Sequence, residues 1–331
     1  MEMYATDLRE KKYKAVNQLT NILYVLTKMR FTSRQDPDRE WVAKSLELLL
    51  NEPKLTHVMA CRNLWNLYAL DYESEDALDR LSQVVMETNE DKLGEIDIAH
   101  TLRAFSHFKY RKYACIEHLL KITIKKADMY KVQTLADVIH SLAELEIVNP
   151  TLLQITKQVL LRKLDRKAEG PNGEPVIQDS DGTDLMPFEM AMVMKAYCKA
   201  GMYEEVELLE SLESAFLERI EDATTSDIVV IFGAHSSWCS NMIDQTHTAK
   251  NQKKRVFKVF KAYSDEVFAK LMDQMSAQID KMNVKGILSV LVHGNLSYLK
   301  RRDNKRMVRD FAIKGLDILS RERDSMGDNF E

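Results

Sequence analysis

Two clusters of basic side chains in the last part of the 331-residue chain have the composition of an anion-binding surface. Members of the first cluster are interleaved with apolar residues and are Lys250, Lys253, Lys254, Arg255, Lys258 and Lys261. The second cluster opens the last predicted helix and comprises Lys300, Arg301, Arg302, Lys305, Arg306 and Arg309. Each phosphate that such side chains neutralise adds a salt-dependent increment to the affinity for a nucleic acid. The clusters therefore predict contact with RNA or with an acidic partner, and a solvated face that balances acidic residues elsewhere is the alternative.

Residue patterns that support catalysis do not occur in the sequence. It contains no HExxH, CxxC, GxGxxG, GxxxxGK[ST] or GxSxG motif, so no metal site, phosphate-binding loop or hydrolase nucleophile is indicated. His235 and His293 take the middle position of apolar triplets, described below, so we expect core or groove histidines rather than ligands. We therefore predict no catalytic residue, no cofactor and no metal. The alternative, an enzyme with a pocket among its helices, would need a cluster of perturbed ionisable groups.

The four cysteines of the chain are Cys61, Cys115, Cys198 and Cys239. They are widely separated in the sequence, and three of the four fall on predicted apolar helix faces. This distribution favours reduced thiols that pack as small hydrophobic side chains. No apolar run is long enough to span a bilayer, so no membrane insertion is predicted. The early acids Glu2, Asp7 and Glu10 are atypical of a secretory or transit peptide.

Charge is unevenly distributed along the chain. Residues 245–331 hold 18 Lys or Arg and 11 Asp or Glu, whereas residues 1–244 hold 29 and 40. The front of the chain is thus acidic and the end is basic. An acidic front argues against a continuous RNA-binding groove along the whole chain and favours protein contacts there.

A pattern of three bulky residues spaced by three, followed by a fourth two positions later, recurs along the chain. Four copies are Leu23/Leu26/Met29/Phe31, Leu64/Leu67/Leu70/Tyr72, Leu102/Phe105/Phe108/Tyr110 and Ile139/Leu142/Leu145/Ile147. Three less regular copies are Met194/Tyr197/Ala200/Met202, Phe232/His235/Trp238 and Val290/His293/Leu296/Tyr298. Residues three apart lie on one stripe of a helix, so each copy predicts an amphipathic helix, which we call helix A.

The spacing of these copies is that of a helical hairpin repeat. Successive copies begin 41, 38, 37, 55, 38 and 58 residues apart. The two long steps contain insertions: residues 169–184, which are rich in Gly, Pro and Asp and read as a loop, and residues 241–252, which continue into a longer helix.

A second amphipathic run, helix B, follows most copies of helix A. These runs are Leu78/Leu81/Val85, Ile116/Leu119/Leu120, Leu152/Ile155/Val159, Val206/Leu209/Leu212/Phe216 and Phe311/Leu316/Leu319. A single hairpin cannot bury its apolar face alone, but stacked neighbours supply the missing core. The predicted fold is therefore all-α, an α-solenoid of about seven two-helix repeats of ~38 residues each. Two ordinary helical bundles are the alternative.

Parts of this repeat resemble known repeat families. Residues 97–105 (DIAHTLRAF) and 135–142 (LADVIHSL) are similar to helix A of the heptatricopeptide repeats of Fas-activated serine/threonine kinase-like proteins. Residues 196–202 (AYCKAGM) resemble a helix turn of pentatricopeptide repeats. The resemblance spans roughly residues 14–321 and implies an RNA-associated protein of an organelle. The RAP domain that ends proteins of that family has no counterpart here, which implies a binding scaffold without cleavage activity.

Four segments follow from these observations: acidic helical repeats in 1–168, the inserted loop in 169–184, middle repeats in 185–240, and basic repeats with a polar tail in 241–331. We predict a non-catalytic scaffold that is a subunit of a larger mitochondrial ribonucleoprotein assembly, such as a ribosome or an RNA-processing or editing complex. Its partners would be proteins at the acidic front and single-stranded or ribosomal RNA, or an acidic partner, at the basic end. The main alternative is a protein–protein adaptor of the tetratricopeptide or HEAT kind without nucleic acid, and the alternative location is the cytoplasm.

Overall fold

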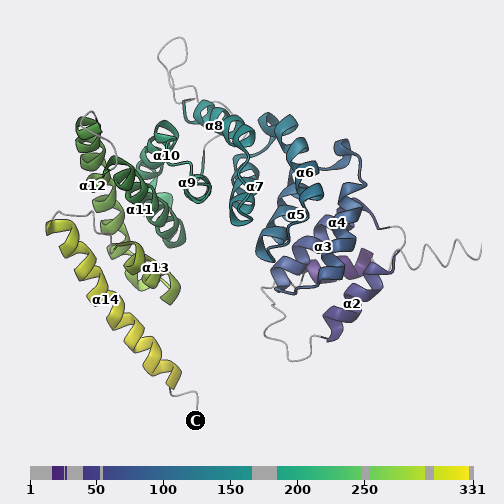
Figure 1. The fold of residues 1–331 in the computed structure, drawn as a ribbon. Coiled ribbons are helices and arrows are strands. Elements are labelled where there is room, and N and C mark those ends of the chain that lie inside the picture. Colours follow the sequence, from purple (N-terminus) through teal and green to yellow (C-terminus); the bar gives the residue numbers. More distant parts are fainter. Residues whose placement is uncertain are drawn as a thin grey trace, which may run out of the picture. The chain divides into compact units, whose positions relative to one another are not determined.

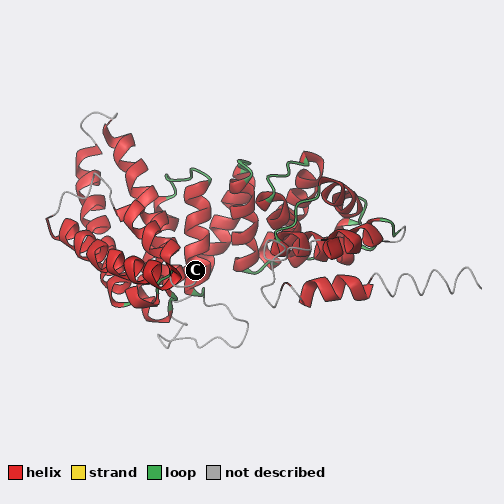
Figure 2. Ribbon diagram, turned by 90° about the horizontal axis from the view of Figure 1, so that it is seen from below, coloured by secondary structure: helices red, strands yellow, loops and turns green. Residues whose placement is uncertain are grey.

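The computed structural model describes residues 17–25, 27, 40–52, 55–165, 185–247, 253–294 and 302–327. Within these ranges it leaves out the side chains of residues 40–43, 165, 243–247, 253–263, 294, 302–304, 319 and 321–327. Every regular element in the described residues is a helix, and none of them is a strand (Figure 2). The prediction of an all-α fold is confirmed.

Two compact units divide the chain between Thr156 and Lys157, and each is described by itself. The first unit contains a helix at residues 17–25 and, in order, α2 (Glu40–Leu50), α3 (His57–Leu70), α4 (Glu75–Met86), α5 (Glu95–His107), α6 (Tyr113–Lys126), α7 (Val132–Glu144) and the first part of α8 (Pro150–Asp165). Short 3-10 turns follow two of the B helices, at η2 (Glu90–Lys92) and η3 (Ala127–Met129).

The second unit holds the rest of α8 and three helix pairs. These pairs are α9 (Pro187–Lys199) with α10 (Val206–Glu218), α11 (Thr225–His247) with α12 (Lys253–Ala277), and α13 (Val284–Gly294) with α14 (Arg302–Gly327). The 3-10 turns η4 (Ile220–Asp222) and η5 (Ile279–Lys281) follow α10 and α12.

Within each unit, A helices pack on A helices and B helices pack on B helices (Figure 1). The A helices, which carry the triplets, are α3, α5, α7, α9, α11 and α13, and the B helices that follow them include α4, α6, α10, α12 and α14. In the first unit α3 contacts α5, α5 contacts α7, and α4 contacts α6. In the second unit the A helices α9, α11 and α13 contact in sequence, as do the B helices α10, α12 and α14. The triplet residues form the core of this packing: Leu64, Phe105, Leu142, Tyr197 and Phe232 are all at most 2% exposed. Burial of these side chains, at about 1.5–3 kcal/mol each, is the main force that holds one hairpin on the next.

Four A helices end in the same way, and this ending explains the fourth residue of the apolar pattern. Each is followed by a residue with positive φ, namely Asp71, Lys109, Glu146 and Gly201. The backbone N–H of the next residue then donates to the carbonyl of the second triplet residue, at 2.9–3.0 Å, in the pairs Tyr72–Leu67, Tyr110–Phe105, Ile147–Leu142 and Met202–Tyr197. This is the Schellman geometry, in which the residue after the left-handed turn packs back on the helix. These helix ends are 38, 37 and 55 residues apart, the spacing of the triplets.

Five A helices also begin in a similar way. One buried residue precedes the N-terminal cap in each of five cases, namely Leu93, Tyr130, Leu185, Ala223 and Met282. Four of these five residues directly follow a 3-10 turn. Three A helices, α5, α7 and α9, thus share one geometry at both ends, although a single series of seven hairpins stays a prediction.

Several sequence-based expectations differ from the structure or lie outside its described residues. Leu316 was expected on the apolar face of helix B but is 60% exposed, because Phe311 and Gly315 form the packed stripe of α14 instead. A Cβ atom on Gly315 would lie 2.7 Å from Cγ2 of Ile287, so glycine permits the close approach of α13 and α14. Residues 241–247 of the second predicted insertion extend α11, while the loop at 169–184 is outside the described residues.

In the described residues, no helix combines the length and the hydropathy that a membrane span requires. All four cysteines are buried free thiols. Burial raises the pKa of Cys61 and Cys115 to about 12, so these thiols pack as neutral hydrophobic side chains.

Candidate functional site

The predicted basic clusters are only partly covered by the described residues. Lys250, Lys300 and Arg301 lie outside them, as do the side chains of Lys253, Lys254, Arg255, Lys258, Lys261 and Arg302. Lys305, Arg306 and Arg309 are exposed on α14, where Arg306 pairs with Asp310 at 3.7 Å. The structure therefore places three of the twelve residues on one exposed helix and leaves the merging of the two clusters untested.

A cavity of about 650 Å³ opens on the A-helix side of the second unit, among α9, α11 and α13. Four lysines from α9, η5 and α13 line it, and no Asp or Glu does. The lining residues are Lys195, Cys198, Lys199, Thr225, Ser226, Val229, Val230, Gly233, Ala234, Ser237, Lys281, Met282, Asn283, Lys285, Gly286, Ser289 and His293. Its volume lies within the range of ordinary ligand pockets.

The lysines come in two pairs with helical spacing. Lys195 and Lys199 are four apart on α9 and thus project from one side of it, and Lys199 is exposed. Lys281 ends η5, and Lys285 lies in the first turn of α13; both are exposed. One pair thus lines the cavity from α9, and the other lines it from the segment that joins η5 to α13. The lining of this cavity therefore carries basic side chains from two parts of the chain and no carboxylate.

Small residues on α11 form the floor of this cavity. A Cβ atom on Gly233 would lie 3.3 Å from both Cδ2 and Nε2 of His293, so the imidazole packs directly on the helix backbone. Burial lowers the pKa of His293, which keeps the ring neutral at physiological pH. A neutral imidazole can donate one hydrogen bond and accept another, so His293 adds a polar contact to the lysine charges.

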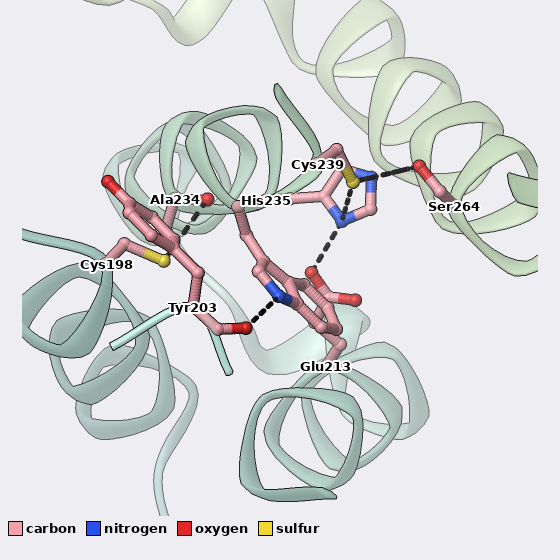
Figure 3. Close-up of polar contacts among 8 residues, drawn as sticks. Cys198, Tyr203, Glu213, Ala234, His235, Cys239 and Ser264 are labelled. Atoms are coloured by element: carbon pink, nitrogen blue, oxygen red, sulfur yellow. Dashed lines mark hydrogen bonds and ion pairs between the residues drawn. The ribbon is translucent and has the colours of Figure 1, made fainter. Parts of the chain in front are cut away.

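A polar cluster lies in the core between α10, α11 and α12 (Figure 3). Nδ1 of His235 is 2.6 Å from Oε1 of Glu213, and Nε2 of His235 is 3.3 Å from Oγ of Ser264 and 3.5 Å from Sγ of Cys239. Oγ of Ser264 is 3.0 Å from Sγ of Cys239. Burial opposes the charged imidazole, but Cys239 and Glu213 beside it hold the pKa of His235 well above its ordinary value. His235 and Glu213 thus form a buried ion pair.

This cluster has the residue types of a nucleophilic active site, a carboxylate that orients a His beside a Cys and a Ser. Its burial argues for another role: His235, Cys239 and Glu213 are at most 1% exposed, and Ser264 is 3% exposed. None of the four lines the cavity. In this conformation no substrate can reach the sulfur or the hydroxyl, and the cluster joins three helices of the core.

The equivalent A-helix side of the first unit is filled by side chains that contact one another. Trp65 of α3 stacks on His100 of α5, with ring centroids 4.5 Å apart. Arg103 of α5 pairs with Asp137 of α7 at 3.3 Å and lies 5.8 Å above the ring of Tyr68. These contacts bridge successive A helices on this side.

Sequence reasoning missed Lys195, Lys199, Lys281 and Lys285, and it missed Glu213 as the partner of His235. The lysines do not form a run, because they are separated by more than 80 residues and meet only through the packing of α9, α11 and α13. One sequence signal could have found them: the two lysines of each pair are four residues apart, within or just before a predicted helix A, and so lie on one side of it. For Glu213, the signal was an acid on the apolar stripe of helix B beside Leu212 and Phe216.

Compared with known proteins, the chain matches no protein-family model and no curated protein sequence.

Proposed function

We propose that this protein is a non-catalytic helical-repeat scaffold, an α-solenoid of about seven hairpins, which serves as a subunit of a larger ribonucleoprotein assembly. Its second unit binds single-stranded RNA, and its acidic front contacts proteins. The observation that carries the proposal is the cavity on α9, α11 and α13, which four lysines line without an acid.

The cavity chemistry favours a phosphate-bearing chain over a folded acidic protein. Lys195 and Lys199 are four residues apart on α9, and Lys281 and Lys285 line the cavity from η5 and the start of α13, so successive phosphates of a strand can be held on both sides. Between the pairs, Val229 and Val230 offer apolar surface for a base. Single strands bind through this combination of a positive groove and apolar or aromatic platforms.

Readout of one base per repeat is not part of the proposal. The positions two before each first triplet residue are Asn21, Arg62, His100, Asp137, Met192 and Val230, which form no polar code. Moreover, Arg62 donates to Asn21 at 2.8 Å and His100 stacks on Trp65, so these side chains are engaged within the protein. Binding is therefore expected to be governed by charge and to be tolerant of sequence.

The mitochondrial setting rests on the resemblance of two A helices, at residues 97–105 and 135–142, to heptatricopeptide repeats. Fractionation of cells that express the tagged natural protein tests it. Recovery in the mitochondrial matrix supports this setting, and recovery in the cytosol alone contradicts it.

The decisive experiment measures binding of a fluorescent single-stranded oligoribonucleotide by anisotropy at several salt concentrations. In the test variant Lys195, Lys199, Lys281 and Lys285 are replaced by Ala. A matched control replaces four exposed lysines of the first unit, Lys92, Lys121, Lys125 and Lys131. Both variants lose the same charge, so a difference between them reports the site rather than the net charge.

We expect the cavity variant to flatten the slope of log affinity against log salt by about 2 to 3, since each phosphate contact on a single strand contributes about 0.7. The control should retain the slope. The triple substitution Lys253/Lys254/Arg255→Ala tests the first basic cluster in the same assay, and unchanged binding would remove that cluster from the interface. If the wild-type chain binds no RNA even at low salt, the protein–protein adaptor becomes the better account.

A further inference from the structure

His293 on α13 is a polar side chain of the cavity that the described residues leave without a partner. The side chain is half-buried, and neither ring nitrogen makes a hydrogen bond or an ion pair with any residue that the structure describes. A neutral imidazole carries one donor and one acceptor, and a protonated imidazole carries two donors. The ring is therefore open to a ligand that enters the cavity.

The packing of three helices places this ring beside the basic side of α9. A Cβ atom on Gly233 would lie 3.3 Å from Cδ2 and Nε2 of His293, so the ring rests on α11 at that position. The carbonyl oxygen of the next residue, Ala234, accepts from Sγ of Cys198 on α9 at 3.5 Å. Helix α9 and His293 therefore flank the same turn of α11, and Lys199, which follows Cys198, lines the same cavity. A strand that crosses the cavity passes between Lys199 and His293.

Two other histidines differ from His293 in having a carboxylate beside them. Nε2 of His107 lies 2.9 Å from Oδ1 of Asp71, and Nδ1 of His235 lies 2.6 Å from Oε1 of Glu213. In both cases the protein itself supplies the negative charge that balances an imidazolium. No Asp or Glu lines the cavity around His293. The charge of a protonated His293 is therefore balanced only when a ligand supplies an anion.

None of the ionisable groups that line the cavity favours a protonated His293. Those groups come from α9 and from the segment that joins η5 to α13, and they are Lys195, Cys198, Lys199, Lys281 and Lys285. Helix α11 contributes no ionisable side chain to the lining, and α14, which also packs on α13, contributes no lining residue. Burial raises the pKa of Cys198, which keeps the thiol neutral, and burial lowers the pKa of His293 below its ordinary value of 6.5. The ring is thus neutral at pH 7 in the free protein.

We propose that His293 contacts a phosphate of the bound RNA strand and takes up one proton when the strand binds, so that the cavity binds RNA more tightly as the pH falls. The proton comes from the solvent and adds to the unprotonated ring nitrogen, and the resulting N–H donates to a phosphate oxygen. No covalent bond to the phosphate forms or breaks. This inference rests on the proposed function, because it concerns the same cavity and the same ligand.

The direction of the pH dependence follows from the two states of the ring. An opposite charge beside a histidine raises its pKa by about 1 to 3, so the complex binds the proton more tightly than the free protein does. By linkage, the affinity gained in this way is complete below the pKa of the free protein and is lost as the pH rises through the pKa of the complex. A rise near the lower end of that range makes the affinity at least about fivefold higher at pH 5.5 than at pH 8. Lysine side chains ordinarily stay charged over this range and add no pH dependence.

The test measures the affinity of the full chain for a fluorescent oligouridylate by anisotropy, at one salt concentration, from pH 5.5 to pH 8. Uridine and the phosphodiester have no group that titrates in this range. In the test variant, His293→Gln, the side chain keeps a donor and an acceptor but cannot take up a proton. The matched control is His107→Gln, at an exposed histidine of the first unit.

We expect the wild type and His107→Gln to bind at least about fivefold more tightly at pH 5.5 than at pH 8. The variant His293→Gln should bind within about twofold of the wild type at pH 8 and lose most of the pH dependence, because the ring is neutral in both states there. Binding by the wild type that does not change with pH, or a pH dependence that His293→Gln retains, overturns this inference and leaves the proposed function standing. Absence of RNA binding at every pH defeats the proposed function itself, and this inference with it.

Nuclear magnetic resonance of the histidine Cε1–H groups is the second readout, because it follows the proton directly. The signal of His293 is assigned by its absence in His293→Gln. Saturating oligouridylate should raise the pKa of His293 by at least about 1 and leave that of His107 unchanged. A pKa of His293 that is the same in the free and the bound protein would show that the ring only packs on Gly233, and it would contradict the phosphate contact.

Discussion

The A-helix sides of the two units use one hairpin geometry for opposite purposes. The position directly after the first triplet residue is Trp65 and Arg103 in the first unit, and Lys195 and Gly233 in the second. In the first unit these side chains reach across to the neighbouring A helix and fill the surface. In the second unit the glycine lets the His293 ring pack on the α11 backbone, and both residues line the cavity together with the lysines.

This difference shows that the fold alone does not decide whether a repeat surface can bind. The triplet core and the packing of successive A helices are shared, and four A helices end alike, while surface positions such as Trp65 and Lys195 differ between the units. In repeat proteins, function is thus carried by the positions that the core does not constrain.

The buried polar contacts of the two units differ as well. The largest change in stability that we predict comes from this difference. Asn63 of the first unit donates to Thr20 at 2.9 Å, a neutral contact, whereas the second unit holds the ion pair of Glu213 and His235. Removing one partner of a buried pair leaves an uncompensated charge, so Glu213→Gln should lower the free energy of unfolding by about 3 kcal/mol. Urea unfolding followed by circular dichroism measures it. Glu221→Gln, at an exposed acid, is the control, and equal effects of the two substitutions would refute the ion pair.

The same pair predicts how stability depends on pH. The folded state raises the pKa of His235 well above its ordinary value of about 6.5, so it binds the proton more tightly than the unfolded chain does. This contribution is complete below the unfolded pKa and is lost as the pH rises through the raised folded pKa. Urea midpoints from about pH 6 to about pH 9 should therefore fall toward alkaline pH in the wild type and fall less in Glu213→Gln. Parallel curves for the two proteins would contradict this assignment.

Opening the filled side of the first unit should have a smaller effect. Trp65→Ala removes the stack on His100 and the contact with Tyr68, at a ring separation of 5.1 Å. Because Trp65 is only partly buried, we expect a loss of about 2 kcal/mol, below the cost for a fully buried aromatic residue. Trp65→Phe keeps a ring in place and should recover about half of this loss. Thermal or urea unfolding measures the stability of both variants. Identical stability of the Ala and Phe variants would show that the stack contributes nothing.

The smallest effects concern the left-handed residue that ends helix A. The second unit uses Gly201 there, with φ of 76°, whereas the first unit has Glu146, with φ of 61°. Gly201→Ala should destabilise by about 1 kcal/mol, and Glu146→Gly should stabilise by a similar or smaller amount, since only Gly adopts this φ without strain. Paired urea titrations check the opposite signs. A loss of stability in Glu146→Gly would mean that its pair with Arg111, at 2.6 Å, outweighs the backbone strain.

Much of the local structure was predictable because the core imposes it. The triplets mark the buried stripe of helix A, and the fourth residue of the pattern marks the Schellman turn that follows, as with Tyr72 and Met202. Leu316 was misplaced because Gly315 lets α14 approach α13 so closely that the packing stripe shifts by one residue. A glycine that allows two helices to lie close together is not an apolar residue of a helix pattern, so the pattern does not reveal it.

The candidate site was predictable only in part. The dense clusters at residues 250–261 and 300–309 attracted attention because they are runs, whereas Lys195 and Lys285 are isolated in the sequence. Their convergence depends on which helices become neighbours, which spacing alone does not specify. Glu213 was missed for a related reason: an acid on a helix is ordinarily solvated, and only the placement of α10 against α11 brings it to His235.

The most direct test of the central claim is photo-crosslinking of a single-stranded oligoribonucleotide that contains 4-thiouridine, with the crosslinked peptides identified by mass spectrometry. The account predicts crosslinks to α9, α11 and the start of α13, around Lys195, Val230 and Lys285, and their loss in the four-lysine variant. Crosslinks concentrated on α3, α5 and α7, where Trp65, His100 and Arg103 fill the surface, would contradict it.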